Sequence, residues 1–175
     1  MEYILISGVH GVGKTFLLNE LKNSSTKHIQ VISISKLIKE FGNDIEQRNK
    51  LVFDITTNQR IWKDKLKNMK FSEEKTVILD GHLCLLDREG VITELPFSTF
   101  EGILIKKLVL KIEQPVIIQQ RLFLRDNIDW DITLLTNFQD TERKRAELLA
   151  SRLQIPLFIY DDDAQIQHLI EFILD

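Results

Sequence analysis

A glycine-rich segment near the N-terminus has the residue types and the spacing needed to bind phosphate. Residues 8–15 read Gly-Val-His-Gly-Val-Gly-Lys-Thr and fit the phosphate-binding loop pattern G-x-x-x-x-G-K-[ST]. Glycines let the backbone curl so that successive N–H groups point at phosphate oxygens, and the dipole of the following helix adds to the attraction. The pattern predicts that the Lys14 ammonium reaches the β- and γ-phosphates of ATP and that the Thr15 hydroxyl binds Mg²⁺.

The alternative interpretation of this segment is a chance glycine-rich turn. With glycine at about 7% of average usage, a random match in a chain of this length has odds on the order of one per cent. The segment also follows a β-rich run and precedes a helical one, which is the structural context that the motif requires. The residues expected to bind the nucleotide are Gly8, His10, Gly11, Val12, Gly13, Lys14, Thr15 and Phe16.

A second candidate site lies at the end of an apolar run. Residues 76–80 read Thr-Val-Ile-Leu-Asp, which is typical of a buried strand that ends in an acid. In phosphoryl-transfer folds a carboxylate at such a position helps to order Mg²⁺, so we expect Asp80 to act at the metal together with Thr15. His82 follows two residues later and has two interpretations, an imidazole beside the phosphates or a hydrogen-bonded structural histidine at the strand exit.

Polar side chains interrupt the apolar face of a helix predicted over Asp44–Met69. Arg48 and Gln59 both fall on the inward face, where the helical period requires apolar residues. Buried polar groups need partners, and an acceptor substrate would lie on this side of the phosphate loop, so both residues are candidate acceptor ligands. The alternative is a solvated arginine near the helix start and a glutamine bonded to backbone.

A second predicted helix, Asp131–Leu153, has the same feature. Gln139, Glu142 and Arg143 interrupt its apolar face. We expect Gln139 and Arg143 to contact the acceptor.

Two arginines on the preceding helix form another candidate site. Arg121 and Arg125 are four residues apart and therefore share a helix face. Convergent arginines suit phosphate recognition, whereas solvated surface arginines are the alternative interpretation.

The composition limits the classes of protein to which the chain can belong. The chain has 175 residues, 43% of them apolar and 28% charged, which predicts a single folded domain over residues 1–175. A net charge of −3 and a pI of about 5.8 argue against a general nucleic-acid binder. The single cysteine, Cys84, excludes an internal disulfide and a thiolate zinc cluster. Apolar runs are too short to span a membrane and no signal peptide is evident, so we expect a cytoplasmic protein.

The elements that must position these residues follow from the periodicity. Short apolar runs alternate with longer segments of helical period, which is typical of βα units around a mainly parallel sheet. We predict strands over Tyr3–Ser7, Val31–Ser33, Thr76–Asp80, Lys107–Ile112 and Leu157–Tyr160, and a hairpin formed by Leu83–Leu86 and Val91–Leu95. The expected helices are Lys14–Asn23, Ser35–Phe41 closed by Gly42, Asp44–Met69, Pro115–Arg125, Asp131–Leu153 and Ala164–Leu174. The predicted fold class is therefore α/β, a three-layer α/β/α sandwich around a five-stranded parallel sheet.

Together these motifs resemble the archaeal-type adenylate kinases, which belong to the P-loop nucleoside and nucleotide kinases. The resemblance rests on residues 8–15, Asp80-Gly81-His82, the hairpin with Gly90 and Pro96, Arg121, Arg125-Asp126 and a long downstream helix with Arg143 and Ala146. It implies an acceptor-binding helical region at about residues 35–70 and a lid at about residues 121–135. It also implies transfer of a phosphoryl group from MgATP to AMP.

The sequence departs from that family in the predicted lid. Residues 125–131 read Arg-Asp-Asn-Ile-Asp-Trp-Asp, where the family has further arginines. Phosphoryl transfer needs cations near the charge that develops between donor and acceptor. The missing arginines therefore count against AMP as the acceptor and against kinase activity itself.

The hypothesis that follows is a small-molecule kinase that uses MgATP and acts on a nucleotide or a nucleoside. Its expected catalytic residues are Lys14, Asp80, Arg121 and Arg125, and its expected acceptor-binding residues are Arg48, Gln59, His82, Gln139 and Arg143. The alternative is a regulatory ATPase that hydrolyses ATP slowly to switch a partner surface. A helicase or AAA-type motor is disfavoured, because the chain after Asp80 is too short for the additional helical domain of such motors.

Overall fold

The computed structural model describes residues 1–24, 29–46, 55–72, 74–86, 89–161 and 164–175, with the backbone alone described for residues 41–46 and 55–61. For two of the residues expected to bind the acceptor, the structure therefore describes no side chain. Arg48 lies outside the described residues, and so does the side chain of Gln59.

Five strands form the central sheet, and every pairing between them is parallel. They are β1 (Tyr3–Ser7), β2 (Ile29–Ser33), β3 (Thr76–Asp80), β6 (Ile105–Lys111) and β7 (Leu157–Tyr160). Their order across the sheet is β2-β3-β1-β6-β7, so β1 lies at the centre, between β3 and β6. Parallel strands end at the same edge of a sheet, and the loops that follow β1 and β3 are therefore neighbours.

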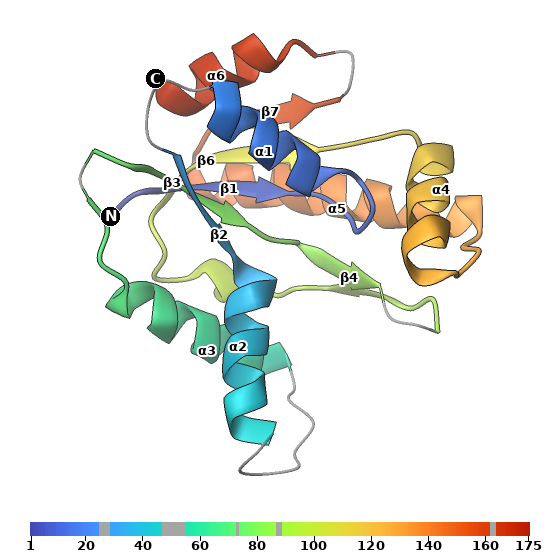
Figure 1. Cartoon of the computed structure of the whole chain (residues 1–175), viewed down its shortest axis with the longest axis horizontal. Coiled ribbons are helices and arrows are strands. Elements are labelled where there is room, and N and C mark those ends of the chain that lie inside the picture. Colours follow the sequence, from blue (N-terminus) through green and yellow to red (C-terminus); the bar gives the residue numbers. More distant parts are fainter. Residues whose placement is uncertain (25–28, 47–54, 73, 87–88, 162–163) are drawn as a thin grey trace.

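Helices cover both faces of this sheet. They are α1 (Lys14–Ser24), α2 (Ile34–Glu46), α3 (Ile55–Asn68), α4 (Pro115–Asp126), α5 (Ile132–Leu153) and α6 (Ile166–Leu174). A separate antiparallel hairpin consists of β4 (Cys84–Leu86) and β5 (Ile92–Glu94), and a short 3₁₀ helix, η1 (Phe97–Phe100), follows it. Figure 1 shows α1 and α6 together on one side of the sheet, with α2 and α3 next to each other at the far side of the molecule.

Alternate residues of β1 belong to two different cores. Tyr3 and Leu5 pack with Trp62 of α3 and Leu149 of α5, among others, on one face. Ile4 and Ile6 belong to the core under α1 and α6 on the other face. This two-residue alternation with both faces buried is typical of a parallel sheet covered by helices.

A third apolar cluster supports the loop that follows β1. It joins that loop to the hairpin, α4 and α5, and consists of Val9, Val12, Cys84, Ile118, Leu122, Leu135 and Phe138. The loop therefore rests on packed side chains from three other elements, which restricts its conformation.

The structure confirms the predicted fold class, the five parallel strands and the hairpin. Strand and helix boundaries differ from the predicted ones by one or two residues at most positions. Among the described residues, no helix is both long enough and apolar enough to cross a membrane.

The prediction of one helix over Asp44–Met69 was wrong. α2 continues through Gly42, the expected stop, to Glu46, and α3 begins at Ile55. A glycine inside a helix costs about 1 kcal/mol relative to alanine, and tertiary packing overrides that preference. Here Leu37 and Ile38 of α2 pack against the core that contains Tyr3 and Leu5 of β1. The residues between the two helices, 47–54, are outside the described part of the chain.

The buried face of β3 gives a direct test of this architecture. Leu79 has no exposed surface and packs in the core shared with α3 and α5. Leu79→Ala is expected to lower the free energy of unfolding by about 3 kcal/mol, because it removes apolar contacts and leaves a cavity. Urea denaturation followed by circular dichroism measures this loss. The matched control is Leu124→Ala on α4, where the side chain is 85% exposed and the expected change is within about 0.5 kcal/mol. Equal losses in the two variants would contradict the assignment of the core.

Candidate active site

The glycine-rich loop joins the end of β1 to the start of α1, as the motif requires. Gly8, Gly11 and Gly13 all have positive φ angles, of 151°, 80° and 97°. At Gly8 a Cβ atom would also lie 2.6 Å from the backbone oxygen of Lys111, at the end of the neighbouring strand β6. Only glycine meets both constraints, so the local backbone explains why the loop needs this residue type.

Lys14 lies at the start of α1 and its side chain folds back over the loop. Its Nζ donates to the carbonyl oxygen of Gly8 at 2.5 Å and lies 3.3 Å from Nδ1 of His82. Burial lowers the pKa of Lys14 to about 8, although the nearby carboxylates of Asp80 and Glu142 act in the opposite direction. Lys14 is therefore close to its own titration point at neutral to mildly alkaline pH.

His82 links the loop to the end of β3. Its Nδ1 lies 2.7 Å from the carbonyl oxygen of Gly8, so this nitrogen carries the proton and donates it to that oxygen. Burial and then the charge of Lys14 hold the pKa of His82 well below its ordinary value. The ring of His10 lies beside that of His82, with a centroid distance of 4.2 Å and an interplanar angle of 40°. Burial lowers the pKa of His10 to about 4. The pKa values of both imidazoles are thus lowered, and Lys14 is the cation that contacts the carbonyl oxygen of Gly8.

Glu142 of α5 is the main site residue that sequence reasoning did not assign a role. Its side chain is fully buried, and Oε1 accepts from the backbone N–H of Gly8 at 3.0 Å. Its carboxylate also accepts from the N–H of Leu83, at 3.0 Å, and from that of Cys84, at 2.7 Å. Burial raises the pKa of Glu142, and these N–H donors and Lys14 counteract the rise. The signal for this residue was present, because an acid interrupts the apolar face of the helix, but only its partners reveal what it does.

Two oxygen-bearing side chains are available for a divalent cation. Asp80 ends β3, and its Oδ1 is buried without a hydrogen-bond partner in the described part of the chain. Burial raises the pKa of Asp80, and the charge of Lys14 opposes that rise. Thr15 is exposed in the first turn of α1. Hard oxygen donors, few in number, fit a Mg²⁺ ion that keeps its other ligands from phosphates and water.

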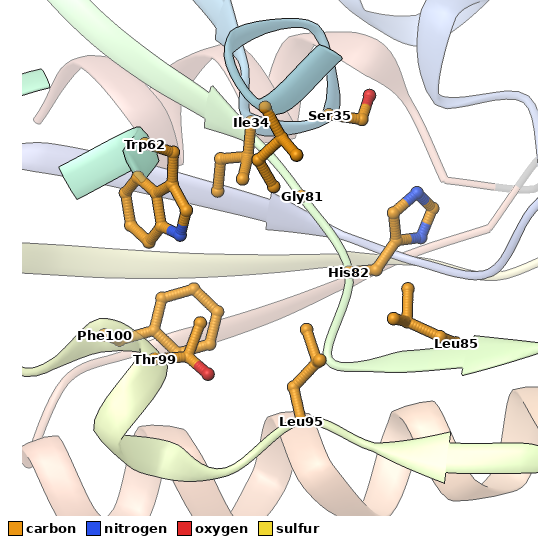
Figure 2. A pocket seen from close by; sticks show the side chains of 10 residues that line it. Ile34, Ser35, Trp62, Gly81, His82, Leu85, Leu95, Thr99 and Phe100 are labelled. Atoms are coloured by element: carbon orange, nitrogen blue, oxygen red, sulfur yellow. The ribbon is translucent and has the colours of Figure 1, made fainter. Parts of the chain in front are cut away.

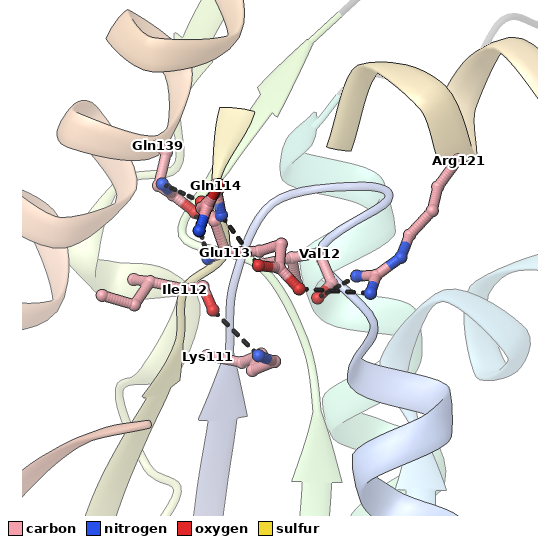
Figure 3. Close-up of polar contacts among 7 residues, drawn as sticks. All are labelled: Val12, Lys111, Ile112, Glu113, Gln114, Arg121 and Gln139. Carbon is pink, nitrogen blue, oxygen red and sulfur yellow. Dashed lines mark hydrogen bonds and ion pairs between the residues drawn. The ribbon is translucent and has the colours of Figure 1, made fainter. Parts of the chain in front are cut away.

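Arg121 of α4 lies directly against the loop (Figure 3). Its Nη1 donates to the carbonyl oxygen of Val12 at 3.0 Å, and its Nη2 lies 3.1 Å from a carboxylate oxygen of Glu113. A Cβ atom on Gly13 would be 2.9 Å from the same guanidinium. The structure thus places Arg121 beside the loop, and its role in catalysis stays a prediction.

The other predicted polar residues have different partners in the described part of the chain. The guanidinium of Arg125 is exposed and pairs with the adjacent Asp126, and that of Arg143 is exposed and pairs with Glu147. The side-chain amide of Gln139 bonds to both the N–H and the carbonyl oxygen of Glu113, which holds the segment between β6 and α4 (Figure 3). Their roles toward substrate stay predictions.

Two of the cavities formed by described residues lie beside the loop. The first, of about 300 Å³, is mainly polar and is lined by Val12, Gly13, Phe16, Leu17, Glu20, Lys111, Arg121 and Tyr160. The second, of about 100 Å³, is mainly apolar and is lined by Ile34, Ser35, Ile38, Trp62, Gly81, His82, Leu85, Leu95, Thr99 and Phe100 (Figure 2). His82 contacts the loop and also lines the second cavity, so the loop and that cavity are adjacent.

A parallel sheet whose central strand leads through a glycine-rich loop into a helix that begins with a buried lysine defines a P-loop protein. The model of the family described as AAA domain matches residues 7–133, and the chain belongs to that family. The crystal structure of a gluconokinase from Sinorhizobium meliloti 1021 is similar to this chain at 15% identity, with a TM-score of 0.49, over 99% of this chain and 89% of that chain. That likeness identifies neither a substrate nor a reaction here. No curated protein matches the sequence.

The family match and the strand–loop–helix geometry support the predicted resemblance at the level of the P-loop fold. The finer specificity of archaeal-type adenylate kinases stays a prediction. The match to this family does not test whether the protein is a helicase or an AAA-type motor, the class that the sequence disfavours. In the described residues after β3, the helices α4, α5 and α6 pack on the sheet or the loop rather than forming a further domain.

The Glu142 contacts predict a specific loss of stability. Glu142→Gln replaces an acceptor oxygen with an NH₂ group that faces backbone N–H donors, so the free energy of unfolding is expected to fall by about 2 kcal/mol. The control is Glu147→Gln on the same helix, where the carboxylate is half-exposed and only pairs with Arg143, and the expected change is about 0.5 kcal/mol or less. Chemical denaturation at pH 7 measures both. Losses of the same size would contradict the role given to Glu142.

Proposed function

We propose that this protein is a kinase that transfers the γ-phosphoryl group of MgATP to a hydroxyl group of a small molecule. The observation that carries this proposal is the position of His82, which contacts the phosphate loop and lines a cavity that could hold an acceptor. A donor bound to the loop and an acceptor bound in the cavity would meet at the carboxyl ends of β1 and β3. This arrangement supports transfer between two bound substrates.

The loop and the polar cavity supply the donor side. Backbone N–H groups of the loop and the N-terminus of α1 would hold the phosphates, with Lys14 as the main side-chain cation. The exposed ring of Phe16, Tyr160 and the guanidinium of Arg121 line the cavity next to Gly13, and flat groups of this kind suit a nucleobase. We therefore place the nucleoside part of ATP in this cavity.

Thr15 and Asp80 would hold the Mg²⁺ ion of the nucleotide, Thr15 directly and Asp80 through water. When bound, the ion neutralises charge on the β- and γ-phosphates. Both residues fit this role, since each offers oxygen and Asp80 has an unpartnered buried Oδ1 among the described residues.

The reaction needs positioning and electrostatics rather than a covalent intermediate. The acceptor oxygen forms a bond to the γ-phosphorus while the bond from that phosphorus to the bridging oxygen breaks, and ADP leaves with the electron pair. The hydroxyl proton of the acceptor is released to water. Lys14 and Arg121 stabilise the charge that develops, and Arg125 would add to it if its pair with Asp126 opened.

Lys14 predicts a characteristic pH dependence of nucleotide binding. Its pKa of about 8 in the nucleotide-free protein lies below the ordinary 10.5, and only its ammonium form attracts phosphate. The affinity for MgATP is therefore expected to stay constant as pH rises to about 8 and then to fall, by up to tenfold per pH unit. Isothermal titration calorimetry between pH 7.5 and 9.5 measures this. In Lys14→Ala the affinity should be at least tenfold lower at pH 7.5, and the decline above pH 8 should disappear. An unchanged affinity in folded Lys14→Ala would contradict the loop assignment.

The contacts of the two arginines predict unequal effects on turnover. Arg121 donates to the loop and pairs with Glu113, whereas Arg125 pairs with the adjacent Asp126. Arg121→Ala is expected to lower acceptor-stimulated ADP release at least tenfold, about 1.4 kcal/mol of barrier, and Arg125→Ala to lower it less. Steady-state kinetics, with thermal unfolding to confirm that both variants fold, separate the two. If no acceptor stimulates ADP release, the regulatory ATPase is the better account.

A further inference from the structure

The guanidinium of Arg121 is held at two points, and Figure 3 shows both contacts. One terminal nitrogen, Nη1, donates to the carbonyl oxygen of Val12 at 3.0 Å, and the other, Nη2, lies 3.1 Å from Oε2 of Glu113. A guanidinium is planar and carries its N–H donors in a fixed fork, so contacts through two different nitrogens fix its orientation as well as its position. The two contacts therefore define how Arg121 faces the polar cavity that it lines.

The two members of this ion pair differ in exposure. The side chain of Arg121 is 43% exposed, whereas that of Glu113 is 6% exposed. A buried carboxylate has lost its hydration and needs donors in return. Besides Arg121, the backbone N–H of Gln114 donates to Oε1 of Glu113 at 2.9 Å. Glu113 is therefore the fixed member of the pair, and Arg121 is the member that a ligand can reach.

The backbone of Glu113 is also held in place. The side-chain amide of Gln139 on α5 donates to its carbonyl oxygen at 2.8 Å and accepts from its N–H at 2.9 Å (Figure 3). Two hydrogen bonds from one amide restrain this residue, which lies between β6 and α4. A chain of contacts thus runs from Gln139 through Glu113 and Arg121 to the phosphate loop.

Helix α5 therefore reaches the phosphate loop by two routes. Glu142 accepts from the N–H of Gly8, where the loop begins, and the chain of contacts from Gln139 ends on the carbonyl oxygen of Val12. Gln139 and Glu142 are three residues apart in the sequence and so lie on one face of the helix. The second route differs from the first because it passes through a cation that lines the polar cavity.

We propose that Glu113 is a positioning residue, which holds the guanidinium of Arg121 in the orientation that contacts a nucleotide bound in the polar cavity. Glu113 acts on the nucleotide through Arg121 alone. This inference rests on the proposed function in one respect, the placement of the nucleotide in that cavity. It deepens that proposal by naming the residue that makes Arg121 effective.

The charge of Glu113 and its positioning role predict opposite effects on nucleotide binding. A carboxylate near the loop repels phosphate, so if only its charge mattered, removal of that charge would strengthen binding. If Glu113 orients Arg121, the same change weakens binding, because the guanidinium then also adopts orientations that do not meet the ligand. The direction of the change therefore distinguishes the two effects.

The first experiment is a double-mutant cycle on nucleotide binding. Isothermal titration calorimetry with Mg²⁺ and the non-hydrolysable ATP analogue AMP-PNP compares the wild-type chain, Glu113→Gln, Arg121→Ala and the double variant. We expect Glu113→Gln to lower the affinity about fivefold in the wild-type background and by about twofold or less in the Arg121→Ala background. A tighter or unchanged affinity in Glu113→Gln, or the same loss in both backgrounds, overturns the proposal. Absence of binding by the wild-type chain overturns the proposed function instead.

Glu147→Gln is the matched control for this cycle. It makes the same substitution in the exposed ion pair with Arg143 on α5, so the affinity for the analogue should stay within about twofold of wild type. Thermal unfolding verifies that all variants fold. If Glu147→Gln loses as much affinity as Glu113→Gln, the effect is not specific to the pair with Arg121, and the proposal is wrong.

Arg121→Lys separates the orientation of the group from its charge. Lysine keeps the positive charge but lacks the planar fork that contacts Val12 and Glu113 together. We expect its affinity for the analogue to fall to within about twofold of that of Arg121→Ala, with little further effect of Glu113→Gln. Full affinity in Arg121→Lys would show that the charge alone is sufficient, and would contradict the need for an oriented guanidinium.

The restraint on Arg121 can also be observed without a nucleotide. Side-chain ¹⁵N NMR resolves two Nη signals where rotation about the Nε–Cζ bond of an arginine is slow, and one averaged signal where it is fast. We expect two signals for Arg121 in the wild-type chain and one in Glu113→Gln, with one averaged signal for the exposed Arg143 in both. This measurement needs neither binding nor turnover, so it does not depend on the proposed function. An averaged signal from Arg121 in the wild-type chain overturns the positioning role of Glu113.

Discussion

The carboxylate of Glu142 is the interaction on which the site depends. It lies at the meeting point of three segments that are distant in sequence, the first residue of the phosphate loop, the segment after β3 and the long helix α5. Backbone N–H groups buried at such a junction need an acceptor, and one carboxylate satisfies all three. Because the bonds are short and buried, they orient the loop relative to the end of β3.

The electrostatics of the site follow from this buried acid. Glu142 and Asp80 both place negative charge near Lys14 and partly offset the cost of burying its ammonium. The pKa values of the two histidines near Lys14 are lowered, first by burial and then by the charge of Lys14. Among the described residues, Lys14 and Arg121 are the cations that contact the loop, Lys14 at the carbonyl oxygen of Gly8 and Arg121 at that of Val12. This distribution of charge suits a ligand whose negative charge lies at the loop.

The two cavities differ in a way that matches two different ligands. The polar cavity is next to Gly13 and Arg121, and the apolar cavity is on the other side of His82. The elements between them are the loop and the end of β3, which Glu142 holds together. Donor and acceptor sides of the proposed reaction are thus held together by the same contacts of Glu142, while Arg125 of α4 pairs with the adjacent Asp126.

The sequence by itself determined the features that depend on neighbouring residues. The loop motif, the short apolar strands and the turn at Gly90 are encoded over a few residues, so the phosphate loop, the parallel sheet and the hairpin were predictable. Tertiary structure decided what depends on distant partners. It extended α2 through Gly42, because packing of Leu37 and Ile38 outweighs a local preference. It also paired Gln139 with the backbone of Glu113 and gave Glu142 its acceptor role, since Glu142 and its partner Gly8 are 134 residues apart and no local pattern specifies that contact.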